Sequence, residues 1–319
     1  MRFHRHLQAS LLAAATLLLA GAARAETILF VGNSFTFGAL SPVWRYRAGT
    51  VTDLNSEGVG GVPALFKLFT DEAGLSYDVS LETHPGIGLD WHWTNGFAKL
   101  DKPWDHVVLQ SFSTLDRDKP GDPGLLVDYA RRWADTFSAR NPAVDIRLTA
   151  TWSRADLTFR TQSPWNGKAI FAMADDLSCG YGQAAKASPR IKGVIEVGQA
   201  FSRAIRAGVA DANPYAGVPF GQVDLWAWDN YHASAFGYYL EALMLFGAVT
   251  GRDPQALGVR EQAAVELGFS PQQTLALEQV AHDELAAAPQ EHCAAPAATP
   301  ASTPSAVPPS ASVPAAAAQ

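Results

Sequence analysis

Residues 27–36 read TILFVGNSFT, an apolar run that leads directly into a glycine, an asparagine and a serine. Five successive apolar or β-branched residues predict a strand buried on both faces, which is typical of a parallel sheet covered by helices. A serine directly after such a strand lies at the carboxyl edge of the sheet, where ligands of open α/β sheets gather. This segment therefore predicts both a fold class and the place of a functional site.

The chain outside this segment alternates strand patterns with helical patterns. We predict further strands over residues 78–81, 106–109, 145–148 and 193–197, and helices over 62–72, 89–100, 124–140, 169–187, 199–209, 233–249 and 271–287, with Gly251 as the stop after the sixth of these helices. Such alternation predicts an α/β fold with a parallel sheet covered on both faces. No repeat and no Pro/Gly-rich linker divides these elements, so we expect one domain.

The N-terminus has the pattern of a signal peptide. Arg2 and Arg5 precede the apolar run 11–20, and Ala-Arg-Ala at 23–25 provides a small-x-small cleavage site. The alternative is a membrane anchor, but the apolar run is well short of the roughly 20 residues that span a bilayer. We therefore predict that residues 1–25 are removed, and that the protein is periplasmic or secreted and keeps no integral membrane segment.

The C-terminal residues 294–319 consist mostly of alanine, proline, serine and threonine and carry no charge. Such a composition does not bury enough apolar surface to offset the entropy of ordering, so we predict a disordered tail. A domain over residues 26–293 remains between the predicted signal peptide and the tail. The formal net charge of the whole chain is −7 without a run of Lys or Arg, which argues against nucleic acid as a partner.

Cys179 and Cys293 are the two cysteines of the chain. They are too few for a disulfide framework, and no C-x-x-C pair indicates a zinc or redox site. An oxidising compartment permits a disulfide between them, and two unpaired buried thiols are the alternative.

Two short segments carry the residue types of a serine hydrolase. Ser34 follows the first strand, although an N-cap serine is also common at such a junction. Asp229 stands three residues before His232, on a turn that leads into a helix. The carboxylate can hydrogen-bond one imidazole nitrogen and leave the other as a general base toward a serine. The alternative is a helix-capping aspartate beside a surface histidine.

Together, Gly-Asn-Ser at 32–34 and Asp229-x-x-His232 resemble the first and last blocks of the SGNH (GDSL-like) hydrolase family, in which G-N-S is a variation of G-D-S. Residues 233–240 are also similar to the family's run into its final helix. The resemblance implies a three-layer α/β/α fold, flavodoxin-like, with a central parallel sheet. It also implies that Ser34 is the nucleophile, His232 the general base and acid, and Asp229 the residue that orients the histidine.

The middle blocks of the family supply the oxyanion hole, together with the N–H of the nucleophile Ser34. For the glycine of the second block we prefer Gly88 to Gly86, because Gly88 directly precedes a predicted helix; a simple turn glycine is the alternative for both. The third block departs from the family pattern, since its glycine and asparagine are absent. Gln110 at the end of a strand carries a side-chain amide that can replace the asparagine, and a satisfied polar group is the alternative.

Other site classes lack their motifs. The chain has no G-x-S-x-G, no dinucleotide fingerprint, no Walker A loop and no H-E-x-x-H. His84, His92 and His106 are scattered without a metal-ligand pattern, so we expect neither a metal nor an organic cofactor. Trp91, Trp93, Trp226 and Trp228 fall near the predicted site, where they form a candidate wall for sugar rings; core positions are the alternative for each.

The resemblance implies a serine esterase. Together with the predicted export, it makes an O-acetyl group on a carbohydrate the expected substrate. Lipase or thioesterase activity is the alternative within the family. A non-catalytic glycan-binding protein on the same fold is the alternative from another functional class.

Overall fold

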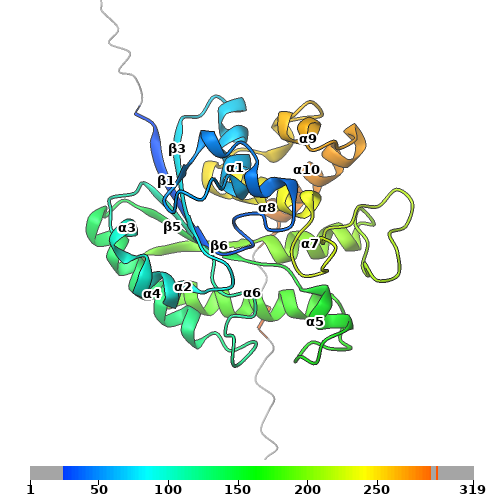
Figure 1. Ribbon diagram of the computed structural model, residues 1–319, viewed down its shortest axis with the longest axis horizontal. Coiled ribbons are helices and arrows are strands. Elements are labelled where there is room, and N and C mark those ends of the chain that lie inside the picture. Colours follow the sequence, from blue (N-terminus) through cyan, green and yellow to red (C-terminus); the bar gives the residue numbers. More distant parts are fainter. Residues whose placement is uncertain (1–23, 289–291, 294–319) are drawn as a thin grey trace, which may run out of the picture.

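The computed structural model describes residues 24–288 and 292–293 (Figure 1). Its centre is a six-stranded sheet in which all neighbouring strands are parallel, in the order β2-β3-β1-β4-β5-β6. The strands are β1 (Glu26–Gly32), β2 (Thr52–Asp53), β3 (Tyr77–Thr83), β4 (His106–Leu109), β5 (Asp145–Ala150) and β6 (Ile191–Glu196). The predicted segment 27–31 thus forms a central strand, between β3 and β4.

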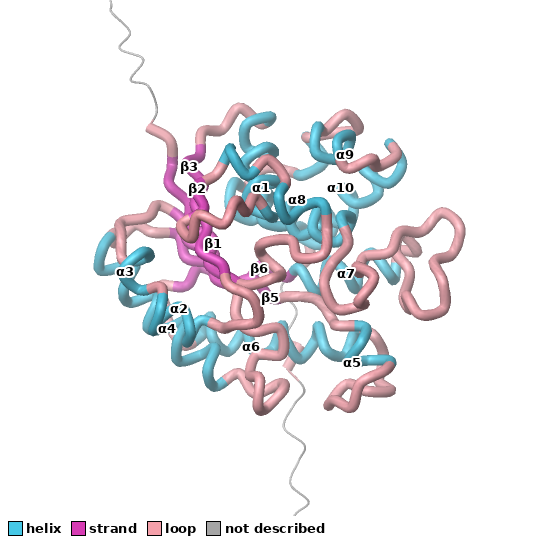
Figure 2. Tube along the Cα trace, in the orientation of Figure 1, coloured by secondary structure: helices cyan, strands magenta, loops and turns pink. Residues whose placement is uncertain are grey.

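Helices cover both faces of the sheet, so the three-layer α/β/α fold is confirmed (Figure 2). Alternate residues of β1 point to opposite layers: Ile28 and Phe30 pack in one core, and Leu29 and Val31 in the other. The first layer contains α1 (Gly61–Glu72), α7 (Val197–Arg206), α8 (Ala235–Thr250) and α10 (Pro271–Ala286). The second contains α2 (Leu89–Asn95), α3 (Phe97–Leu100), α4 (Gly124–Arg140) and α6 (Phe171–Lys186).

The predicted strands and the long helices are all present, with small shifts at their ends. Residues 124–140 form a helix with the predicted bounds, and Gly251 ends α8 in the left-handed conformation, with φ of 67°. The prediction of one continuous helix over 89–100 was wrong, because the segment forms two helices, α2 and α3, that are separated at Gly96. A Cβ there would lie 3.1 Å from the His92 carbonyl oxygen and 3.5 Å from the Glu82 carboxyl group.

The strand-to-helix junction at β6 also differs from the prediction. Val197 was expected in the strand, but it begins α7. Gly198 permits this early turn, because a Cβ at that position would lie 2.3 Å from the carbonyl oxygen of Thr151. The short elements β2, α5 (Ala155–Phe159) and α9 (Gln262–Glu266), and three 3-10 helices at Pro42–Arg45, Ala48–Thr50 and Pro254–Ala256, had not been predicted.

Cys179 and Cys293 form a disulfide, with 4.7 Å between their Cα atoms, so residue 293 is joined covalently to α6. The pairing that the sequence left open is therefore present. The tail predicted over 294–319, and nearly all of the signal peptide predicted over 1–25, lie outside the described residues. Across residues 24–288 and 292–293, no helix is both long and apolar enough to cross a bilayer.

Candidate active site

Ser34 lies in a tight turn at the carboxyl end of β1. The turn is closed by the Phe37 N–H, which donates to the Asn33 carbonyl oxygen at 3.0 Å, and by the Ala39 N–H, which donates to the Ser34 carbonyl oxygen at 3.0 Å. From α8, the Tyr238 hydroxyl also donates to the Ser34 carbonyl oxygen, at 3.2 Å. The serine backbone is therefore held both by its own turn and by the final large helix.

Asp229 and His232 form the carboxylate–imidazole pair that the sequence predicts. Asp229 Oδ2 is 2.7 Å from His232 Nδ1, and Asp229 Oδ1 accepts the backbone N–H groups of Tyr231 and His232 at 3.1 and 3.0 Å. Burial favours the neutral acid, but these hydrogen bonds, led by the one from the imidazole, outweigh it and lower the pKa of Asp229 below its ordinary value. Asp229 is thus an ionised partner that orients the ring.

This pair is carried by a narrow loop that enters α8. Trp226 and Ala233 form an isolated antiparallel bridge, and the Ser234 N–H donates to the Leu225 carbonyl oxygen at 2.9 Å. Asn230, at the tip, has a positive φ of 56°, a conformation that asparagine tolerates better than most residues. The loop therefore fixes the spacing of the acid and the histidine.

Phe35 brings the serine turn and the histidine loop into contact. Its ring meets the His232 ring edge-on, with 5.8 Å between the centroids, and stacks on Trp152 on another side. Ser34 itself is buried, and the His232 side chain is mostly buried. Within residues 24–288, neither Ser34 Oγ nor His232 Nε2 has a hydrogen-bond partner, so neither of the two atoms is engaged elsewhere.

The backbone N–H groups of Ser34, after β1, and of Gly88, in the loop after β3, have no acceptor in the described part of the chain. Gly88 is the N-cap of α2, and a Cβ there would lie 2.7 Å from Asp90 Oδ1 and 3.1 Å from Ser111 Oγ. Gly86 has a positive φ of 64°, as a turn glycine does. Free N–H groups at such positions are suited to a developing oxyanion.

Gln110 is buried, and its amide is largely occupied by neighbours. Its Oε1 accepts from the Asn33 N–H at 2.9 Å and from Thr36 Oγ1 at 3.1 Å, and its Nε2 donates to the Ser111 carbonyl oxygen. The second N–H of Nε2 has no acceptor among the described residues. Gln110 therefore supports the serine turn directly and has one donor left.

Asn33 holds three loops together, a role that the sequence did not reveal. Its Nδ2 donates to the carbonyl oxygens of Ile87 at 2.8 Å and Ser111 at 3.1 Å, and its Oδ1 accepts the Phe35 N–H at 3.1 Å. These partners lie on the loops after β3, β4 and β1. One buried side chain thus connects the three strand ends around Ser34.

The four tryptophans of the expected wall do not lie together at the surface. Trp226 is buried in the core, and Trp93 packs against Trp133 with 5.0 Å between ring centroids. Trp91 stacks on His84 at 4.5 Å, and Trp228 is 80% exposed directly beside Asp229. Of the four, only Trp228 offers most of its side chain to the solvent at the site.

The three histidines named above occupy separate places. His84 stacks on Trp91, His92 is fully buried, and His106 pairs with Glu26 near the start of β4. In the part of the chain that the structure describes, no group of three or more His, Cys, Asp or Glu side chains is placed to hold a metal ion.

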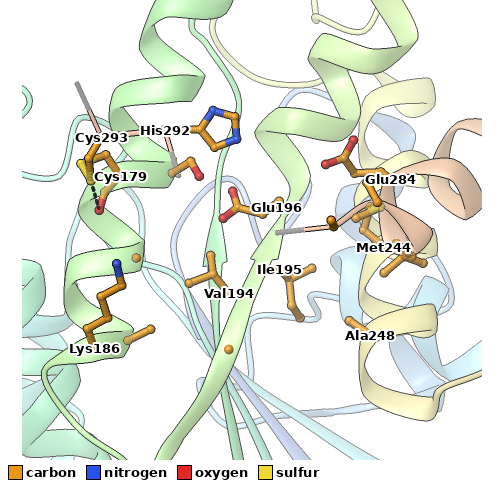
Figure 3. A pocket seen from close by; sticks show the side chains of 17 residues that line it. Cys179, Lys186, Val194, Ile195, Glu196, Met244, Ala248, Glu284, His292 and Cys293 are labelled. Carbon is orange, nitrogen blue, oxygen red and sulfur yellow. Dashed lines mark hydrogen bonds between the residues drawn. A yellow bond between two sulfur atoms is a disulfide. The ribbon is translucent and has the colours of Figure 1, made fainter. Parts of the chain in front are cut away.

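A cavity of about 530 Å³ lies away from these residues, along β6 (Figure 3). Val194, Ile195 and Glu196 of β6 line it, together with side chains from α6, α8 and α10. None of Ser34, Asp229 and His232 is in its lining. The serine and the histidine face the carboxyl edge of the sheet, not this cavity.

Comparison with known proteins finds the same fold at low identity. A DUF4886 family protein from Bacteroides uniformis has a TM-score of 0.53 and 18% identity, over 82% of this chain and 95% of the other. A protein assigned as a GDSL-like lipase from Parabacteroides merdae has a TM-score of 0.50 and 17% identity, over 71% of this chain and 95% of the other. No family model and no curated protein matches the sequence. The chain therefore has an SGNH-hydrolase-like fold.

Proposed function

We propose that this protein is a serine esterase with Ser34 as nucleophile, His232 as general base and acid, and Asp229 as the residue that orients the histidine. The observation that carries the proposal is the 2.7 Å carboxylate–imidazole pair, on a loop that meets the Ser34 turn through Phe35. The assignment of one structurally similar protein as a GDSL-like lipase supports an ester as the substrate.

The chemistry follows from the positions of the protons. Asp229 accepts a hydrogen bond from the Nδ1–H of His232, which leaves Nε2 as the basic nitrogen that takes the Ser34 hydroxyl proton. The serine oxygen attacks the ester carbonyl, and the imidazolium returns the proton to the departing alcohol. Water, activated by the same nitrogen, then releases the acyl group from Ser34.

The backbone N–H groups of Ser34 and Gly88 are the proposed oxyanion donors, with the free N–H of Gln110 Nε2 as a third. Both backbone groups lack other acceptors within the described residues, so they are available to the carbonyl oxygen as it gains charge. Loss of one such donor lowers kcat by about 10²–10³-fold in other acyl-transfer enzymes.

The proposed substrate is an O-acetyl ester of a carbohydrate, acted on in the periplasm or outside the cell after removal of a signal peptide. Trp228 supports a sugar, because its largely exposed ring stands next to Asp229 and aromatic faces stack on sugar rings. Activity against a series of esters with increasing acyl length distinguishes an acetyl ester from the longer acyl chain of a lipase or thioesterase substrate.

The test is hydrolysis of p-nitrophenyl acetate by the full chain and by Ser34→Ala and His232→Ala. We expect both variants to lose at least about 10³-fold in kcat. Ser202→Ala is the matched control, since Ser202 is a buried serine on α7 that donates to the Gly198 carbonyl oxygen. Equal rates in the wild type and in Ser34→Ala would exclude a Ser34 esterase. In that case, binding of acetylated glycans that does not depend on Ser34 would point to a binding protein.

A further inference from the structure

A second carboxylate–imidazole pair lies beneath the serine turn. His92 of α2 is completely buried, and Glu82 of β3 is 1% exposed. Glu82 Oε2 contacts His92 Nδ1, and His92 Nε2 lies 2.9 Å from the carbonyl oxygen of Gly32, the last residue of β1. We propose that His92, held by Glu82, is a positioning residue that fixes the serine turn for catalysis; the inference rests on the proposed function.

The contacts determine where the protons are. A carbonyl oxygen only accepts, so His92 Nε2 carries a hydrogen that it donates to Gly32. On the other side of the ring, His92 Nδ1 contacts Glu82 Oε2. The pair therefore holds the ring in the one orientation that directs a donor at β1.

The peptide unit between Gly32 and Asn33 is held at both ends. Its carbonyl oxygen receives the hydrogen bond from His92 Nε2, and its N–H donates to Gln110 Oε1 at 2.9 Å. Because a peptide unit is planar and rigid, two bonds from opposite ends fix its rotation about the chain. The next residue is Ser34, so the direction of this plane sets the position from which its side chain starts.

A role confined to satisfying the carbonyl group would not require this pair. The His84 N–H already donates to the same Gly32 oxygen, at 3.3 Å. Burial of two ionisable side chains carries a large desolvation cost, and an apolar pair of similar volume is often at least as stable. A directed hydrogen bond at the nucleophile turn explains why an ionisable pair stands here.

Two amide variants separate positioning from general stability. In a histidine site, the amide nitrogen of glutamine takes the place of Nε2 and that of asparagine takes the place of Nδ1. His92→Gln therefore keeps a donor toward Gly32, and His92→Asn keeps only the contact with Glu82. We expect His92→Asn to lower kcat for p-nitrophenyl acetate about 10²-fold, with KM within about twofold, and His92→Gln to retain most of kcat.

His106→Asn is the matched control, since His106 Nε2 also pairs with a glutamate, Glu26, at 2.6 Å but near the amino ends of the strands. We expect it to leave kcat unchanged. Equal losses of kcat in His92→Asn and His92→Gln, in a protein whose Ser34→Ala variant is inactive, would overturn the positioning role and leave the proposed esterase intact. A wild-type rate in Ser34→Ala would instead remove the proposed function.

The hydrogen on the His92 ring can also be observed in the wild-type protein, without a variant and without an activity assay. Long-range 1H–15N correlation spectra report which ring nitrogens of His92 carry hydrogen. We expect a protonated Nε2 whose hydrogen exchanges slowly with water, because the site is fully buried. An unprotonated Nε2 would overturn the inference, since no donor would then face Gly32.

Discussion

The contacts of Asn33 explain why the serine turn carries an amide and not a carboxylate at this position. Both hydrogens of its Nδ2 are used, on the carbonyl oxygens of Ile87 and Ser111. An ionised carboxylate has no hydrogen to donate and would face two carbonyl oxygens in a buried position. The loops after β3 and β4 therefore depend on the amide.

We predict that Asn33→Asp lowers the free energy of unfolding by about 1–3 kcal/mol at neutral pH, the usual cost of buried polar groups left without partners. The loss should shrink in acid, because protonation of the introduced carboxyl group restores one donor. Urea unfolding at about pH 5 and about pH 8 measures both effects. Asn95→Asp, at an exposed helix end, is the control and should change little. Equal midpoints for Asn33→Asp and the wild type would contradict the role assigned to Asn33.

At the scale of elements, α8 connects the core to the histidine loop, and Gly237 is the point of closest approach. A Cβ there would lie 2.4 Å from the Leu225 carbonyl oxygen, 2.8 Å from Phe201 Cζ and 2.9 Å from the Ala233 Cβ. Leu225 and Ala233 belong to the loop that carries Asp229 and His232. A larger residue at 237 must therefore displace that loop.

We predict that Gly237→Ala destabilises the protein by about 1–3 kcal/mol, as expected for overpacking, and also lowers kcat. Gly182→Ala in α6 is the control, because no atom lies within 4 Å of its Cβ position. That variant should gain about 0.5–1 kcal/mol from helix propensity at unchanged kcat. Thermal unfolding and ester hydrolysis are the measurements. A Gly237→Ala protein as stable and as active as the wild type would contradict the account of this contact.

The elements that could be predicted from sequence are those whose pattern is local. Residues 124–140 show a long helical period, and 27–31 are continuously apolar, so both were found. The helical pattern of residues 89–100 continues through Gly96, where the helix is broken, and β2 is only two residues long. Neither the break nor this short strand leaves a periodic pattern in its own segment.

At the scale of the whole molecule, the proposed catalytic residues could be named from sequence because each lies in a short local motif, one directly after β1 and the other on the loop that enters α8. The positioning residues could not. Glu82 directly follows a predicted strand and His92 lies within a predicted helix, and only the packing of α2 over β1 and β3 brings them beneath Gly32. For Gln110 the sequence suggested only the role of an oxyanion donor, and the contact of its oxygen with the Asn33 N–H could not be predicted.

Three largely buried glutamates give the molecule a distinct pH dependence. Burial raises the pKa values of Glu196, Glu261 and Glu278 to about 7 each, above 4.5 in the unfolded chain. At pH values between about 4.5 and about 7, the folded protein therefore binds more protons than the unfolded chain. The stability that the three protonated carboxyl groups contribute at low pH is lost as the pH rises from about 4.5 through about 7. Each pKa unit of difference corresponds to about 1.4 kcal/mol.

We predict that stability falls between about pH 4.5 and about pH 7.5, and that Glu278→Gln makes this fall shallower, because it removes one of the titrating groups. Urea unfolding across this range is the measurement. Glu266→Gln is the control, since hydrogen bonds from Arg47 and Tyr46 lower the pKa of Glu266 and keep its titration below the range. The same slope in Glu278→Gln and the wild type would contradict the assignment.

The central claim is that Ser34 is a nucleophile activated by His232. A fluorophosphonate, which forms a covalent bond with such serines, tests it through mass spectrometry of the labelled protein. We predict one adduct per chain, located on the peptide that contains Ser34, absent in Ser34→Ala and formed far more slowly in His232→Ala. An adduct on another serine, or ester hydrolysis without any adduct on Ser34, would contradict the claim.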